Sequence, residues 1–277
     1  MEHEKQLAGL MGPEESTRIL GALQHGAKRR DVLAMLMAGG MQAALAGSIA
    51  GVATSAQAQA PRKGGRIKVA GPVSSVADTL DPARAANQAD YARGFMFYNG
   101  LTYLDSSLTP QPQLAEEFTT KDAKTWVFKL RRGVTFHDGK PLAPADVVFS
   151  LMRHKNPATG SRAKVLADQI EEVTASGPNE VTIRLVAPNA DLPAILGTYH
   201  FHIVKDGTTD FNAGIGTGPY KVKEFKPGVR SIAVRNENDW KPGRPYLDEI
   251  EYVGIADETA RVNALLAGEL DLIGTVN

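Results

Sequence analysis

Two histidines separated by one residue, His200 and His202, are the side chains whose spacing most directly suggests chemistry. If they lay on a strand, both rings would point to the same face and could together ligate a metal ion. Two ligands are too few by themselves, and the neighbouring sequence adds no third histidine. We therefore expect structural or exposed histidines here, and no metal site.

His137 is a second candidate, but it precedes Asp138-Gly139, where its ring could hydrogen-bond the backbone of a turn rather than act in catalysis. The sequence contains no GxSxG elbow, no HExxH, no Walker-type phosphate loop and no strand-linked GxGxxG followed by an acidic residue. The glycine-rich residues 214–220 lead through Pro219 into a strand, so they cannot bind phosphate at a helix N-terminus. We expect no catalytic residue and no cofactor.

Composition narrows the class of protein. The chain has 277 residues, of which 43% are hydrophobic, enough to bury a sizeable core. Its 31 basic and 31 acidic residues give a formal net charge of zero, which argues against electrostatic binding of nucleic acid. Because the sequence contains no cysteine, a disulfide, a thiolate metal ligand and a lipidated cysteine are excluded.

The first 58 residues are predicted to be a leader and an export signal. Arg29 and Arg30 precede an uncharged, Gly- and Ala-rich run at residues 32–52, an order typical of a twin-arginine signal. Small residues follow, and the spacing of Ala56 and Ala58 favours cleavage after Ala58. A retained membrane anchor is the competing interpretation, since the run approaches the roughly 20 residues of a bilayer span.

The elements around residues 125–153 follow from local patterns. Trp126, Phe128 and Leu130 alternate with more polar neighbours, which predicts a strand with one apolar face. Asp138-Gly139 predicts a sharp turn, because glycine tolerates positive φ. Pro144 suits the first turn of a helix, in which valine, leucine and methionine side chains recur on one side.

Further elements are predicted along the chain. A helix is expected at residues 87–98, and a strand at 198–204 would place Tyr199, Phe201 and Ile203 on one face. The other predicted elements are strands at 66–69, 249–255 and from 270, hairpins around 177–179 and 226–228, a short helix from 190 to 197, and a helix capped by Asp257 and ended by Gly268 with Ala260, Val262, Leu265 and Leu266 on one side.

Residues 125–153, TWVFKLRRGVTFHDGKPLAPADVVFSLMR, resemble a signature of the extracellular solute-binding proteins of family 5, which serve dipeptide, oligopeptide and nickel ABC importers. Stretches that begin at Tyr98, Gly216 and Asn238 agree with the same family in the same order. One departure is Ala143, where the family often has a threonine able to cap the helix, a loss of about 1 kcal/mol.

The resemblance implies an α/β fold: a periplasmic-binding-protein-like type II first lobe with an inserted α+β subdomain, comprising residues 59–277, with the second lobe absent. In the family, the residues just past an LDPA-like turn approach the ligand, and here these positions are Ala86, Asn87 and Gln88. The alternative is a solvated loop in which Asn87 caps a helix. Both interpretations are open on the sequence alone.

The implied function is capture of a peptide-like solute in the periplasm and its delivery to an ABC transporter permease, without catalysis. Export by the Tat translocase and a monomeric state are expected. Nickel chelates, opines or sugars are alternative solutes within the family. From other classes, the alternatives are an exported hydrolase, which would need a nucleophile or metal in one pocket, and a non-functional fragment.

Overall fold

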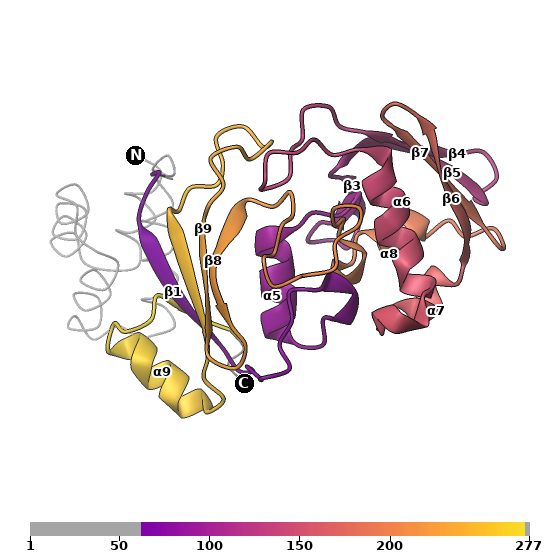
Figure 1. Ribbon diagram of the computed structural model, residues 1–277. Helices are drawn as coiled ribbons and strands as arrows, with labels where there is room; N and C mark the ends of the chain where they lie inside the picture. The colour runs from indigo at the N-terminus through magenta and orange to yellow at the C-terminus, as the bar shows by residue number, and fades with distance from the viewer. Residues whose placement is uncertain (1–61, 275–277) are drawn as a thin grey trace, which may run out of the picture. The chain divides into compact units, whose positions relative to one another are not determined.

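The computed structural model describes residues 62–274 of the chain. The strands of this part form a five-stranded sheet, a four-stranded sheet and a two-stranded pair. Helices pack against the two larger sheets (Figure 1). The predicted signal residues Arg29, Arg30, Ala56 and Ala58 lie outside the described residues. Among residues 62–274, every helix is too short or too polar to cross a membrane.

The first sheet has five strands in the order β11-β1-β10-β9-β8. These are β1 (Arg66–Gly71), β8 (Tyr220–Lys226), β9 (Arg230–Arg235), β10 (Glu249–Gly254) and β11 (Leu272–Ile273). β1 pairs in parallel with both β10 and β11, whereas β8, β9 and β10 are successively antiparallel. A strand from the start of the described chain therefore lies between two strands from its end. The predicted strands and hairpin of this sheet are confirmed.

Two helices accompany this sheet. α5 (Gln88–Phe97) packs against β8, and its Phe97 joins Leu80, Tyr220 and Ala233 in a buried cluster. α9 (Glu258–Leu266) connects β10 to β11 and begins where the carboxylate of Asp257 accepts the N–H of Ala260 at 2.7 Å. The cap and the helix are as predicted.

The apolar side predicted for α9 is only partly covered. Leu266 is 80% exposed and Ala260 is exposed, whereas Arg261 is buried. The guanidinium of Arg261 donates to the carbonyls of Ile255 and Ala256 at 2.7 and 3.0 Å, which draws the charged side of the helix inward.

The second sheet is antiparallel, in the order β4-β5-β7-β6. Its strands are β4 (Ala115–Thr120), β5 (Thr125–Leu130), β6 (Ile170–Gly177) and β7 (Glu180–Leu185). α6 (Pro144–Met152) packs on this sheet (Figure 1), and its Val147 and Leu151 join Trp126 and Phe128 in the main hydrophobic core. The predicted inward face of β5 is confirmed.

The turn and helix start between β5 and α6 also form as predicted. Gly139 has a φ of 83°, and the N–H of Phe136 donates to the carbonyl of Lys140 at 2.8 Å. Ala143 has no side-chain acceptor for the first turn of α6, but the carboxylate of Asp146 accepts the N–H of Ala143 at 2.7 Å. Half of a reciprocal capping arrangement is therefore present.

Short elements connect the two sheets. They are the strands β2 (Thr102–Leu104) and β3 (Pro110–Pro112), the helices α7 (Lys164–Ala167) and α8 (Leu192–Leu196), and the 3-10 helices η1 (Pro82–Arg84), η2 (Arg153–Lys155), η3 (Pro157–Thr159) and η4 (Tyr199–Phe201).

The strand predicted at residues 198–204 is wrong. Tyr199–Phe201 is a 3-10 helix, and the segment after it joins no sheet. The N–H of Ile203 donates to the carbonyl of Asn99 at 2.8 Å, and that of Val204 to the hydroxyl of Ser150 at 2.9 Å. Without a neighbouring strand, alternating hydrophobicity does not by itself produce a ladder, because strand propensity depends on its tertiary partners.

The glycine-rich residues 214–219 serve close packing. A Cβ on Gly216 would lie 2.0 Å from the carbonyl oxygen of Phe97, and a Cβ on Gly218 would lie 2.5 Å from the Phe97 carbonyl carbon. These glycines let the segment approach the end of α5, as close backbone contact requires.

Candidate functional site

The loop that carries the predicted site follows the carboxyl end of β1. In sheets with parallel strands, ligands bind preferentially outside the carboxyl ends of those strands. Both β1 and its parallel neighbour β10 end beside this loop, since a Cβ on Gly254, the last residue of β10, would lie 2.1 Å from the Cβ of Ser74. The loop continues through Pro82–Arg84 into α5.

The three predicted residues lie at the start of α5. Ala86 and Gln88 are exposed, and Asn87 is half-buried. The side-chain oxygen of Asn87 accepts the N–H groups of Ala89 and Asp90 at 2.9 and 3.2 Å. The structure therefore contains the helix cap that the sequence offered as the alternative, and a role for these residues in binding stays a prediction.

A buried ionic cluster lies beneath this loop. Nη1 of Arg93 lies 2.9 Å from the carboxylate of Asp78 and 3.3 Å from that of Asp90, and all three side chains are nearly inaccessible. Nε of Arg93 donates to the hydroxyl of Ser231 on β9 at 2.7 Å, which ties α5 to the first sheet. Asn87 joins the cluster by donating its side-chain N–H to Asp78 at 3.1 Å.

The cluster also fixes the backbone of the loop. The carboxylate of Asp90 accepts the N–H groups of Thr79 and Ala86, both at 3.0 Å. Burial would raise the pKa of Asp78, but the Arg93 guanidinium and hydrogen bonds from Asn87 and Ser75 outweigh it and hold that pKa below its ordinary value. Asp78 is therefore an anion at neutral pH, and it holds the loop through charge-assisted hydrogen bonds.

This cluster was not predicted from the sequence. The spacing of Asp90 and Arg93, at i and i+3 within the predicted helix, was the available signal for one pair. Nothing local indicated that this pair would be buried against Ser231, which is 138 residues from Arg93.

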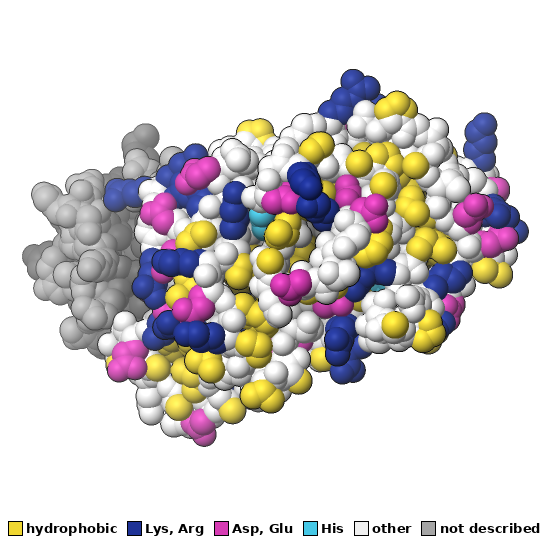
Figure 2. Space-filling model, viewed as in Figure 1, with side chains coloured by type: hydrophobic (Ala, Val, Ile, Leu, Met, Phe, Trp, Pro, Cys, Tyr) yellow, Lys and Arg dark blue, Asp and Glu magenta, His cyan; other side chains and the backbone are white. Residues whose placement is uncertain are grey.

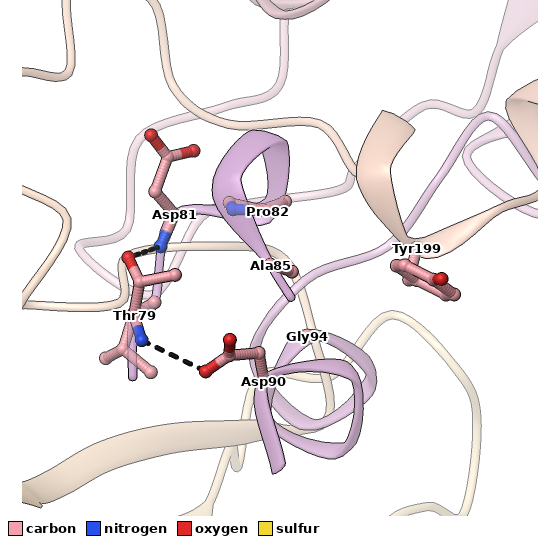
Figure 3. A pocket seen from close by; sticks show the side chains of 8 residues that line it. Thr79, Asp81, Pro82, Ala85, Asp90, Gly94 and Tyr199 are labelled. Carbon is pink, nitrogen blue, oxygen red and sulfur yellow. Dashed lines mark hydrogen bonds between the residues drawn. The ribbon is translucent and has the colours of Figure 1, made fainter. Parts of the chain in front are cut away.

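A small hollow borders the loop (Figure 3). It is lined by Thr79, Leu80, Asp81, Pro82, Ala85, Asp90, Gly94 and Tyr199. Its interior has room for about one water molecule. The carboxylate of Asp81 points away from Asp90 in this view. It forms a bidentate ion pair with the guanidinium of Arg153, with N–O distances of 2.8 and 2.7 Å. The hollow is too small for a solute, so a solute would have to lie on the open surface beside it.

Aromatic rings border the same hollow. The rings of Tyr91 and Tyr199 are stacked with centroids 3.8 Å apart, and the ring of His200 lies 4.4 Å from that of Tyr199. Burial and the neighbouring Tyr91 raise the pKa of Tyr199 to about 12, so its phenol is neutral at physiological pH. Nε2 of His200 lies 3.0 Å from the carbonyl of Ala85, which joins this group to the loop.

His200 and His202 do not form a metal pair. His202 is buried, with its ring edge-on to that of Phe95 at 5.3 Å, whereas His200 is directed to Ala85. Burial lowers the pKa of His202 to about 3. Within residues 62–274, no group of three or more His, Asp or Glu side chains could hold a metal ion.

The ring of His137 is hydrogen-bonded to the glycine-rich segment at residues 214–219. Its Nε2 lies 3.0 Å from the carbonyl of Gly218, and the N–H of Gly216 donates to its Nδ1 at 3.3 Å. Burial lowers the pKa of this ring, which suits a neutral tautomer that donates from Nε2 and accepts at Nδ1. The ring thus bonds backbone groups, as expected, but those of residues 214–218 rather than those of the Asp138-Gly139 turn that the sequence predicted.

Fold and site together define a class: a mixed α/β lobe of the type II periplasmic binding proteins, with its loops at the ends of parallel strands. Residues 109–277 match the family model described as bacterial extracellular solute-binding proteins, family 5 Middle. The chain belongs to this family.

Known proteins agree with this assignment. The glutathione-binding protein GsiB of Escherichia coli K12 is 30% identical over 226 residues, 79% of this chain and 44% of that protein. The oligopeptide-binding protein AppA of Bacillus subtilis is 33% identical over 193 residues, 64% of this chain and 35% of that protein. The chain thus spans less than half the length of these curated relatives.

Solved structures share the fold. The periplasmic binding protein AgaA in complex with agropinic acid, from A. tumefaciens R10, has a TM-score of 0.70 at 27% identity and covers 76% of this chain and 43% of its own. AppA from Bacillus subtilis in complex with a nonapeptide has a TM-score of 0.70 at 25% identity, with coverages of 78% and 45%.

Proposed function

We propose that this chain is part of the solute-binding component of an ABC importer and captures peptide-like solutes by reversible, non-covalent binding. Family membership supports the class, because family 5 proteins bind solutes for transport. Peptide is the first choice, since GsiB and AppA are described as glutathione- and oligopeptide-binding proteins.

The observation that carries the proposal is the loop after β1, whose backbone is hydrogen-bonded to buried carboxylates. Ala86 and Gln88 of this loop are exposed. The backbone N–H of Ala86 donates to the buried carboxylate of Asp90, which fixes the position of the loop. A surface that is fixed before binding loses little conformational entropy when a solute arrives. We propose that Ala86, Asn87 and Gln88 contact the solute from the lobe built on the first sheet, and that the second sheet is an inserted subdomain.

The same proposal includes the cellular setting. The signal around Arg29 and Arg30 would direct export through the Tat translocase, followed by cleavage near Ala58. The protein would then act as a monomer in the periplasm and deliver its solute to a permease in the inner membrane. Figure 2 shows basic and acidic side chains interspersed on one face. Such a surface is expected for a protein that does not bind polyanions electrostatically.

Calorimetric titration of the 277-residue chain with a panel of di- to pentapeptides tests the proposal. We expect saturable binding of at least some members, with every peptide recovered intact by chromatography. Absence of binding across the panel would contradict solute capture, heat from a nickel chelate alone would contradict the choice of peptide, and cleaved peptide would indicate the hydrolase alternative.

A further inference from the structure

Two arginines beside the proposed binding loop have no acidic partner among the described residues. Arg84 and Arg162 are both exposed, and neither forms an ion pair or a side-chain hydrogen bond within residues 62–274. Two carboxylates near them in the sequence are already engaged: Asp81 binds Arg153, and Asp168 binds Lys164 at 2.7 Å. Their positive charges are therefore available to an external anion.

The fold brings these two arginines together from distant parts of the chain. Arg84 ends the 3-10 helix that precedes the binding loop, and the N–H of Arg162 donates to the carbonyl of Ala83 at 2.9 Å. The backbone of Arg162 is thus held against Ala83, the residue before Arg84, although 78 positions separate the two arginines in the sequence. Arg84 in turn lies two positions before Ala86.

The aromatic pair lies next to this basic surface. Tyr199 stacks on Tyr91, and the adjacent His200 contacts the carbonyl of Ala85, the residue that follows Arg84. Burial lowers the pKa of His200, and the positive charge of nearby Arg162 lowers it further. Gln88, Tyr91 and Phe95 follow one another at i, i+3 and i+7, so they share one side of α5, and Phe95 is 54% exposed.

We infer that Arg84 and Arg162 bind a carboxylate group of the solute beside the stacked rings of Tyr91 and Tyr199. The solute class is then a carboxylate-bearing peptide or amino-acid derivative with an apolar portion that lies on the rings. This inference rests on the proposed solute-binding function. The chemistry fits because guanidinium groups match a carboxylate with two parallel N–H donors, and aromatic faces accept the apolar part.

A matched pair of probes isolates the carboxylate. Glutathione carries two carboxylates, and glutathione diethyl ester has the same backbone with both neutralised. Titration of each into the 277-residue chain is compared with titration into Arg84→Gln and Arg162→Gln. Lys121→Gln is the control, because Lys121 is an exposed cation in the turn between β4 and β5 and its removal changes the net charge equally.

We expect glutathione to bind more tightly than its diethyl ester, and each arginine variant to weaken glutathione binding about five-fold, the upper range for a partly exposed ion pair. Binding of the ester should be unchanged in both variants, and Lys121→Gln should behave as the wild type. Higher salt should weaken glutathione binding in the wild type more than in either variant.

The outcomes separate this inference from the function it rests on. Equal binding of the two probes, unchanged glutathione affinity in both arginine variants, or a wild type that binds neutral peptides but not glutathione would overturn the inference and leave solute capture standing. A wild type that binds no member of the peptide panel would overturn both. Equal unfolding midpoints of the variants in urea establish that a lost affinity is not a lost fold.

Discussion

Arg93 is the cation of the buried ionic cluster beneath the candidate site. It neutralises part of the charge of Asp78 and Asp90 in a position where only 1% of its surface is accessible. A buried carboxylate that loses its cationic partner is left with an uncompensated charge, which is far more costly than loss of a surface ion pair. The loop of Ala86 and Asn87 depends on the same carboxylates.

Replacement of Arg93 should therefore destabilise the protein strongly. We expect Arg93→Leu to lower the free energy of unfolding by about 3–5 kcal/mol, measured by urea denaturation at pH 7. Arg132→Leu, at an exposed arginine in the turn after β5, is the control and should change it by less than about 0.5 kcal/mol. Similar small effects of the two substitutions would show that the ionic cluster does not stabilise the fold.

His202 should make stability depend on pH. Burial lowers its pKa to about 3 in the folded protein, below the ordinary value of about 6.5 expected after unfolding. Between these pH values the unfolded chain binds more protons, so the free energy of unfolding is fully retained above pH 6.5 and falls as the pH decreases toward 3. The slope from this residue is about 1.4 kcal/mol per pH unit.

Comparison with His202→Gln isolates this contribution, since His154 and the carboxylates titrate in both proteins. Burial also lowers the pKa of His154, to about 4, so the wild-type curve alone would combine the two rings. Urea denaturation from pH 7 to 4 should give a shallower decline for the variant. Parallel curves for the two proteins would mean that His202 is not buried in its neutral form.

At the scale of elements, α6 offers a direct test of capping. Asp146 accepts the N–H of Ala143, but Ala143 provides no acceptor in return. Ala143→Thr should add that acceptor and raise the free energy of unfolding by about 1 kcal/mol, measured in urea. Ala143→Val has a similar shape without the hydroxyl, so an equal gain in both variants would assign the effect to packing rather than to capping.

Local signals predicted most elements of this fold. Asn87, Asp257 and Pro144 begin helices as expected, because capping and proline chemistry act within one turn. The segment of Tyr199 failed, because a strand needs a partner that the alternation of residues cannot reveal.

The candidate site was predictable only in part, for the same reason. The position of Ala86, Asn87 and Gln88 at the start of α5 follows from the sequence. What surrounds them does not: Arg93 meets Ser231, and Tyr91 meets Tyr199, across more than a hundred positions. Such contacts depend on the tertiary arrangement of distant segments, which local patterns do not reveal.

At the scale of the whole molecule, the order β11-β1-β10 makes the ends of the described chain interdependent. β1 lies between strands that form about 180 to 200 positions later, as the pairing of Arg66 with Glu249 and of Val69 with Leu272 shows. Contacts of such long range must form together, which favours a cooperative lobe and slow assembly. The loop after β1 is connected to that sheet through Arg93, which donates to Ser231 on β9 and pairs with Asp78 and Asp90.

Solute binding at this loop is tested most directly by backbone amide NMR of the 277-residue chain, recorded during titration with a peptide that binds in calorimetry. We predict that the largest shift changes fall on Ala86, Asn87 and Gln88 and extend to Tyr91 and Tyr199. Amides in the distant turn at Lys121 should stay unchanged. Saturable binding that leaves residues 86–88 unperturbed and shifts another surface would contradict the account.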